Sequence, residues 1–287
     1  WLTMGPRTAD FEQSFSRTLD GCPCALVSSG TTALHLALHA LGVGPGDEVI
    51  VPSLTFVATA NVVIQVGARC VFADIVSLEE PLMDPRAVQA ALTPRTRAVM
   101  PVHYAGFRAD MSALEAIVKK ERARRKKAGE TRPLDLVEDA AHAAGARDEK
   151  GRPLGAIGAA GCFSFFSNKN IASGEGGLVA ASDPALMKRL RLLRSHGVTR
   201  QTWERHKGAA VNKADLYDVI EPGFNYRPTE ITAALAAAQL RKIRSTLRTR
   251  KQLFNRAHKK LGRHPDIILP FLSPERWGAP AFHILPI

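Results

Sequence analysis

The feature that most constrains the fold is a regular alternation of short apolar runs with longer segments of helical periodicity. Short strands are predicted at residues 48–51, 70–73, 98–102, 134–137 and 178–181, and helices at 57–66, 85–92, 111–125 and 184–194. Strands that alternate with helices at this spacing form βαβ units, whose strands are mainly parallel. The sequence therefore predicts an α/β fold with a mainly parallel sheet flanked by helices.

Composition places the chain among ordinary globular proteins. Its 287 residues, with 45% hydrophobic and 23% charged residues, allow one large domain and a smaller second one. No apolar run is long enough to cross a bilayer, and charges near the amino terminus argue against a signal peptide, so we expect a cytoplasmic protein. The scattered cysteines fit neither a disulfide framework nor a zinc site, and we expect reduced thiols and no metal.

The formal net charge of +12 raises the alternative of a nucleic-acid-binding protein. Much of this charge lies at 119–127 and 241–263, in patterns typical of amphipathic helices with basic faces. We expect segment 119–132 to be a charged surface insertion, and a single alanine-rich helix from Ile231 to about Leu247. Since no helix-turn-helix, zinc-finger or aromatic RNA-binding signature accompanies the charge, specific nucleic-acid binding is disfavoured. A phosphate-bearing substrate would be served equally well.

Three further features indicate a binding site. The Ser-Gly-Thr-Thr turn at 29–32 opens a helix, and free N–H groups at a helix start can bind phosphate. Asp139 ends a strand, at the edge of the sheet where ligands sit in open α/β folds. Lys169 lies between an apolar run and a glycine-rich turn, where partial desolvation would favour the free amine. Each feature also has a structural interpretation, as a helix cap, a turn cap or a solvated lysine.

Pyridoxal 5′-phosphate (PLP) requires these three features together. Its phosphate needs N–H donors and hydroxyls, its ring nitrogen needs a carboxylate, and its aldehyde needs a lysine that holds it as a Schiff base. Phe56 follows another strand and is a candidate stacking face for the ring, although an aromatic residue is more often part of the core. The sequence thus favours a PLP enzyme.

Several motifs also resemble one family in their order along the chain. These are SSGTTALHLAL, PGDEVIVPSLTFVATAN, VEDAAHAAGA, FSFFSNKNIASGEGGLV and GFNYRPTEITAALAAAQL. They are similar to the DegT/DnrJ/EryC1/StrS family of PLP-dependent sugar aminotransferases. The resemblance implies the fold of PLP-dependent transferases of type I, which is aspartate-aminotransferase-like, and a homodimer with active sites at the interface.

The resemblance also implies a role for each site residue. Lys169 would hold PLP and carry protons, and Asp139 would pair with the ring nitrogen. Phe56 would stack on the ring, and His142 would lie beside it, near its phenolic oxygen. The phosphate would be bound by Gly30, Thr31, Thr32 and Ser164, and by Asn225 of the neighbouring subunit.

The implied reaction moves an amino group from an amino acid, usually L-glutamate in this family, to a keto sugar that we expect to be nucleotide-linked, with ping-pong kinetics. One branch of the family replaces the lysine with histidine and dehydrates sugars, so Lys169 favours transamination. Residues 1–228 would form the large PLP-binding domain. Residues 229–287 would form a linking helix and the start of a small carboxyl-terminal domain, which is shorter than in relatives. A non-catalytic protein that retains the fold is the remaining alternative.

Overall fold

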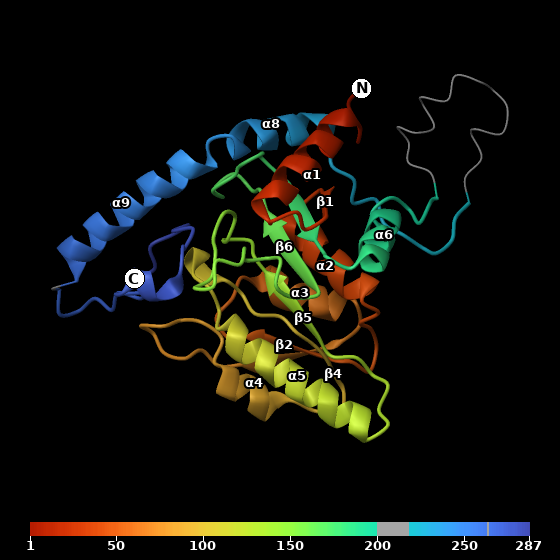
Figure 1. Cartoon of the computed structure of the whole chain (residues 1–287), viewed down its shortest axis with the longest axis horizontal. Coiled ribbons are helices and arrows are strands. Elements are labelled where there is room, and N and C mark those ends of the chain that lie inside the picture. Colours follow the sequence, from red (N-terminus) through yellow and green to blue (C-terminus); the bar gives the residue numbers. More distant parts are fainter. Residues whose placement is uncertain (200–217, 263) are drawn as a thin grey trace.

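A computed structural model describes residues 1–199, 218–262 and 264–287 (Figure 1). Within this part of the chain, seven strands form one sheet in the order β1-β7-β6-β5-β4-β2-β3. The strands are β1 (Cys24–Val27), β2 (Glu48–Pro52), β3 (Arg69–Ala73), β4 (Thr96–Val99), β5 (Asp135–Asp139), β6 (Ala160–Ser164) and β7 (Gly177–Ala180). The predicted strands are therefore present, with ends that differ by a few residues.

Most neighbouring strands are parallel, as the alternating pattern predicts. The pairs β2–β3, β2–β4, β4–β5 and β5–β6 are parallel. Only β7, among the described strands, runs against its neighbours β6 and β1. Since β1 and β6 are both antiparallel to β7, β1 runs in the same direction as β6 and β5. The carboxyl ends of β1, β2, β5 and β6 consequently lie at one edge of the sheet.

Helices cover both faces of the sheet (Figure 1). One face packs against α2 (Gly30–Ala40), α3 (Val57–Gln65) and α6 (Pro184–Leu193). The other face packs against α1 (Pro6–Thr18) and α8 (Glu230–Leu240) at one end, and α4 (Pro85–Ala91) and α5 (Met111–Lys127) at the other. In β1, Ala25 and Val27 face the first group, whereas Cys24 and Leu26 face the second, as the two-residue period of a strand requires. The fold is thus a three-layer α/β/α arrangement.

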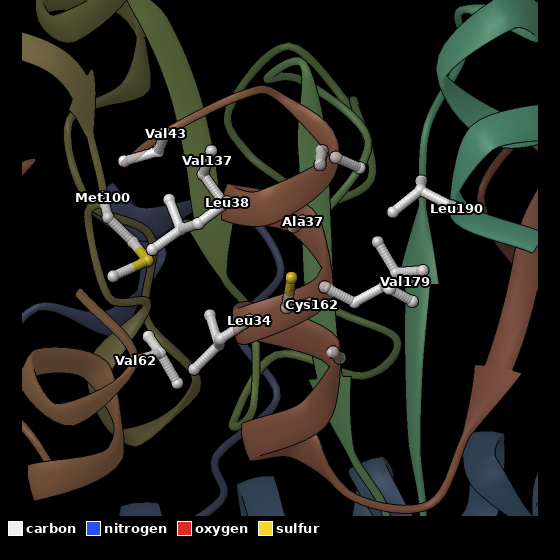
Figure 2. Packing of buried hydrophobic residues seen from close by; sticks show 14 of the residues in the cluster. Leu34, Ala37, Leu38, Val43, Val62, Met100, Val137, Cys162, Val179 and Leu190 are labelled. Atoms are coloured by element: carbon white, nitrogen blue, oxygen red, sulfur yellow. The ribbon is translucent and has the colours of Figure 1, made fainter. Parts of the chain in front are cut away.

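Helix α2 lies at the centre of the largest core cluster. Figure 2 shows Leu34 and Leu38 directed toward Val62, Met100 and Val137, with Ala37 near Cys162 on the sheet. The helix begins with a capping box, in which Ser29 Oγ accepts from the Thr32 N–H at 3.1 Å. Because both its body and its first turn are fixed, the start of α2 is held firmly at the carboxyl edge of the sheet.

Most residues of segment 119–132 are exposed, as predicted for a surface segment, but its first part is helical and one of its residues, Arg125, is buried. Residues up to Lys127 continue α5, and the Arg125 side chain is only 2% exposed. Arg125 Nε donates to Glu121 Oε1 at 2.9 Å, and its guanidinium also donates to the Thr93 carbonyl at 3.0 Å. The charge of Arg125 is thus paired with a carboxylate, and its guanidinium also has a carbonyl acceptor. These bonds allow a side chain of a strongly charged helix to be buried.

The predicted single helix from Ile231 is wrong, because it is divided in two. α8 ends at Leu240 and α9 (Ile243–Leu261) begins after Arg241 and Lys242. α8 packs on α1, while α9 extends away from the sheet and only Phe254 among its residues is buried (Figure 1). The 3-10 turns η1 (Tyr104–Gly106) and η2 (Pro274–Trp277) complete the assigned elements of the described chain.

The last segment is extended but forms no assigned strand within residues 278–287. Ala279 pairs with Arg147, and the Ala281 and His283 N–H groups donate to the carbonyls of Gly106 and Ala105 at 2.9 and 2.8 Å. The segment therefore docks beside η1. Across the described residues, no helix combines the length and apolarity that a membrane crossing requires.

Candidate active site

The predicted site residues follow strands whose carboxyl ends share one edge of the sheet. Asp139 is the last residue of β5, and Ser164 is the last residue of β6. Gly30 follows β1 by three positions, and Lys169 lies in the loop after β6. Parallel strand topology thus brings together residues that are up to 139 positions apart in the chain.

Asp139 is a buried carboxylate with a donor on each oxygen. Thr59 Oγ1 donates to its Oδ2 at 2.8 Å, and the Ala141 N–H donates to its Oδ1 at 3.1 Å. Burial raises the pKa of Asp139, while Thr59, Ala141 and the positive charge of Lys169 act in the opposite direction. Such a group is stabilised as an anion when a cationic partner comes close.

Lys169 is half-buried, and its ammonium is partly desolvated. Burial lowers the pKa of Lys169, and the negative charge of Asp139 partly opposes this shift. The loop that carries the lysine is held by backbone hydrogen bonds, including Lys169 N–H to the Phe166 carbonyl at 2.9 Å and Ser173 N–H to the Phe165 carbonyl at 2.8 Å. A lysine in this setting has a more available free amine than an exposed one.

His142 is a neutral imidazole of defined tautomer. The Ala105 N–H donates to His142 Nδ1 at 3.2 Å, so the proton of the neutral ring is on Nε2. Burial, with further contributions from Lys169 and His283, lowers the pKa of His142 to about 2. The His283 ring lies against it, with centroids 4.4 Å apart. His142 can therefore donate one hydrogen bond from Nε2 without carrying charge.

The start of α2 and the end of β6 form a narrow cradle. A Cβ added to Gly30 would lie 2.8 Å from Ser164 Cβ, so only glycine allows this close approach. The first turn of a helix leaves N–H groups without intrahelical partners, and here they stand beside the Ser164 hydroxyl. This arrangement suits a phosphate, with Gly30, Thr31 and Ser164 as its predicted ligands.

The hydroxyl of Thr32 already forms hydrogen bonds that cap this helix start. Its hydroxyl donates to the Ser29 carbonyl at 2.8 Å and accepts from the Ser29 N–H at 3.0 Å. Both its hydroxyl and its N–H thus serve the capping box. A direct role of Thr32 in phosphate binding stays a prediction.

Two predicted residues are presented to solvent. Phe56 precedes α3 at the carboxyl end of β2 and is 73% exposed. Asn225 is exposed between Phe224 and Tyr226, whose rings stack 4.8 Å apart. Among the described residues, no hydrogen bond or ring contact joins either side chain to Lys169 or Asp139. Their assigned roles, on the ring face and in a neighbouring subunit, stay predictions.

Several site-supporting residues have no signal in local sequence patterns. Glu138 is fully buried, and it accepts from His103 Nε2 at 2.9 Å and from the Gly155, Ile157 and Gly158 N–H groups. Burial alone would raise the pKa of Glu138, but these donors hold it below its usual value. Local sequence patterns indicate at most a turn cap at Glu138, because its hydrogen-bond partners are 17 to 35 positions away.

The residues present fit PLP. A buried carboxylate, a half-buried amine and a glycine-lined helix start with a hydroxyl beside it are the donor set that this cofactor needs. The three-layer α/β/α fold and this site together define the class of PLP-dependent transferases.

Comparison with known proteins identifies the family. The whole chain, residues 1–287, matches the DegT/DnrJ/EryC1/StrS aminotransferase family, and the chain belongs to it. The spore coat polysaccharide biosynthesis protein SpsC of Bacillus subtilis (strain 168) is 38% identical over 285 residues, which are 99% of this chain and 68% of SpsC.

Solved structures of aminotransferases support the same family assignment. S. venezuelae DesV, in complex with a ketimine intermediate, is 36% identical with a TM-score of 0.85, over 99% of this chain and 69% of DesV. Helicobacter pylori PseC, an aminotransferase involved in pseudoaminic acid biosynthesis, is 26% identical with a TM-score of 0.84, over 99% of this chain and 70% of PseC. The predicted family, type I fold and cofactor are confirmed: the chain is a PLP-dependent sugar aminotransferase.

Proposed function

We propose that this enzyme transfers the amino group of L-glutamate to a keto sugar joined to a nucleoside diphosphate. The observation that carries the proposal is the placement of a half-buried Lys169 within electrostatic reach of a buried Asp139, at the carboxyl edge of the sheet. The net charge of +12 supports a phosphate-bearing substrate. The choice of glutamate rests on the family resemblance.

PLP, when bound, supplies an aldehyde that condenses with amines and a ring that accepts an electron pair from the carbon next to the amine. The chain supplies the groups around it. The Asp139 carboxylate would accept a hydrogen bond from the ring nitrogen and favour its protonated form. Gly30, Thr31 and Ser164 bind the phosphate and fix the position of the ring.

Lys169 Nζ moves the proton. Because burial lowers its pKa, a larger fraction of Lys169 than of an exposed lysine is the free amine that can take a proton from the α-carbon of the amino donor. In the second half of the reaction, the same nitrogen returns a proton to the sugar carbon that receives the amine. His142 would be available to donate from Nε2 to the phenolic oxygen of bound PLP, since its Nδ1 accepts from the Ala105 N–H.

We assign the site to a homodimer. Asn225 is exposed on a segment held by backbone hydrogen bonds from Tyr226 N–H to the Arg194 carbonyl and from Ser28 N–H to the Tyr226 carbonyl, so it is available to a second subunit. Ile220, in the same segment, is an apolar side chain with 66% exposure, which supports a covered surface there. We also keep the division into a large domain, 1–228, and a second part that begins with α8.

The experiment is identification of the lysine that binds PLP. The protein loaded with PLP is reduced with borohydride and digested, and mass spectrometry locates the pyridoxyl label. We expect the label on Lys169 and its loss in Lys169→Ala, while the exposed Lys188→Ala keeps it. A label elsewhere, or none, would refute the assignment.

The substrate assignment needs its own measurement. The enzyme is incubated with L-glutamate and a panel of keto sugars, free or linked to nucleoside diphosphates, and 2-oxoglutarate is measured. We expect turnover with nucleotide-linked sugars only. Double-reciprocal plots of the initial rate, at several concentrations of the second substrate, should give parallel lines, as for ping-pong kinetics. Equal turnover of free sugars would exclude the nucleotide requirement.

A further inference from the structure

A directed chain of hydroxyl groups leads to Asp139. Thr55 Oγ1 donates to Thr59 Oγ1 at 2.7 Å, and Thr59 Oγ1 donates to Asp139 Oδ2 at 2.8 Å. An ionised carboxylate only accepts hydrogen bonds, so the single proton of Thr59 must point to Asp139. The oxygen of Thr59 is then left to accept, and Thr55 has to donate. The direction of both bonds is therefore fixed by the charge of Asp139.

The burial of these groups makes the chain energetically important. The Thr59 side chain is 0% exposed, and Asp139 is 5% exposed. Water has little access to replace a lost donor, and a hydrogen bond to a buried charge is stronger than one between neutral groups. The second carboxylate oxygen is held by the Ala141 N–H at 3.1 Å. Thr59 and Ala141 together fix the plane of the carboxylate.

The position of Thr55 links the chain to a second part of the site. Thr55 lies in the loop between β2 and α3, directly before Phe56, and Thr59 lies in the first turn of α3. The Thr59 N–H also donates to the Phe56 carbonyl at 3.1 Å. One short segment, 55–59, thus holds the carboxylate for the ring nitrogen and carries the side chain assigned to the ring face.

We propose that Thr59 is a positioning residue that orients Asp139 toward the ring nitrogen of PLP, and that Thr55 fixes the Thr59 hydroxyl in its donating direction. This inference rests on the proposed role of Asp139. It adds two residues to the reaction, neither of which needs to touch the cofactor. The Thr-Phe-Val-Ala-Thr segment would then both begin α3 and orient Asp139.

The test compares cofactor affinity in matched variants. Apo-protein is titrated with PLP and its dissociation constant is obtained from absorbance. Thr59→Val keeps the shape of the side chain but removes the donor, and we expect the dissociation constant to rise about tenfold or more, as for a lost hydrogen bond to a charged group. Thr59→Ser keeps the hydroxyl and should remain within about threefold of wild type. Thr55→Val should give a smaller increase than Thr59→Val.

Thr96→Val is the control for a general loss of stability. Thr96 in β4 is also 0% exposed, and its hydroxyl accepts from the Thr93 N–H at 2.9 Å, away from the site. We expect it to lower the thermal midpoint while leaving the PLP dissociation constant unchanged. Unchanged PLP affinity in Thr59→Val would overturn the inference, and so would equal weakening in Thr96→Val.

A pH measurement separates positioning from mere packing. The groups that face Asp139 from neighbouring elements are Lys169 after β6, His103 after β4 and Cys162 on β6, and the variants alter none of them. Removing a donor to the ionised form makes Asp139 easier to protonate. Acidification should therefore release PLP at a higher pH from Thr59→Val than from wild type, and Thr59→Ser should restore the wild-type midpoint. An unchanged midpoint in Thr59→Val would contradict the positioning role.

Asp139→Asn distinguishes this inference from the proposed function. If Asp139→Asn binds PLP as tightly as wild type, the role of Asp139 itself is wrong. If Asp139→Asn weakens binding and Thr59→Val does not, only the role of Thr59 is wrong. Weakening by both substitutions, with rescue by Thr59→Ser, supports the two together.

Discussion

Asn170 and Ala281 are joined by a hydrogen bond across 111 positions of the chain, from Asn170 Nδ2 to the Ala281 carbonyl at 2.8 Å. Asn170 is 8% exposed and directly follows Lys169. Its Oδ1 lies 3.2 Å from His283 Nδ1, so the amide holds two residues of the last segment. The loop of the predicted active-site lysine is therefore fastened to a segment that follows α9.

Asn170→Ala should weaken this attachment. The substitution removes both bonds and leaves the buried partners unsatisfied, so we expect the free energy of unfolding to fall by about 1–3 kcal/mol, measured by urea denaturation. The amides of Ala281 and His283 should also exchange their hydrogens faster. Asn61→Ala, on the exposed face of α3, is the control, and its effect should stay within about 0.5 kcal/mol. Equal small effects in both variants would contradict the prediction.

Glu230→Ala should destabilise the protein through α1. The buried Glu230 carboxylate accepts from the Gly5, Arg7 and Thr8 N–H groups at 2.7–2.9 Å, and from the Thr8 hydroxyl at 2.7 Å. The substitution leaves the start of α1 without its acceptor, and we expect a loss of about 2–3 kcal/mol in thermal or urea unfolding.

The matched control for Glu230 is Glu130→Ala, since Glu130 makes one exposed ion pair with Arg124 at 3.2 Å. It should cost about 0–1 kcal/mol.

The stabilisation by Glu230 should depend on pH. Although burial raises the pKa of Glu230, the donors from Thr8 and its neighbours lower it below the usual value. Its stabilising effect is thus complete above the unfolded pKa, about 4.3, and is lost as pH falls through the lower folded pKa. The difference between wild type and Glu230→Ala should therefore shrink only below about pH 4; a constant difference down to pH 2 would contradict this.

Asp139→Asn should change the acidity of Lys169 in the apo-protein. The negative charge of Asp139 opposes the effect of burial, so its removal should lower the pKa of Lys169 further. The rate of acetylation of Lys169 by acetic anhydride, followed by mass spectrometry against pH, measures this shift. Asp10→Asn, an exposed carboxylate on α1, should leave the profile unchanged. A profile that moves to higher pH in Asp139→Asn would refute the prediction.

Mixed dimers should reveal whether Asn225 acts on the neighbouring subunit. Lys169→Ala and Asn225→Ala should each have low activity as homodimers. In a mixed dimer, one site combines the intact Lys169 of one subunit with the intact Asn225 of the other. After random association, half of the dimers would contain one subunit of each variant, and each of these would have one active site of two. Roughly a quarter of wild-type activity should therefore return. No recovery after mixing would show that Asn225 acts within its own subunit or not at all.

The class of fold was predictable from the sequence, and a centre for the site could be suggested from it, because both signals are local. Alternating strand and helix patterns predict the parallel sheet, and each strand end is visible in the sequence near Asp139 and Ser164. Lys169 is marked by its glycine-rich surroundings. The errors arose where charge was used as a measure of exposure, as for Arg125, or where alanine-rich periodicity concealed the end of α8.

The sequence by itself determined the class of fold and the family, and it suggested residues for the chemistry; the tertiary structure decided how those residues are held. Thr59 and Asp139 are 80 positions apart, and Asn170 and Ala281 are 111 apart, so no periodicity or spacing predicts either bond. Such bonds depend on the order of strands in the sheet and on how α3 and the last segment pack against it. Local propensity acts over a few residues, whereas the orientation of a buried carboxylate is fixed by whichever donors the packed layers bring beside it.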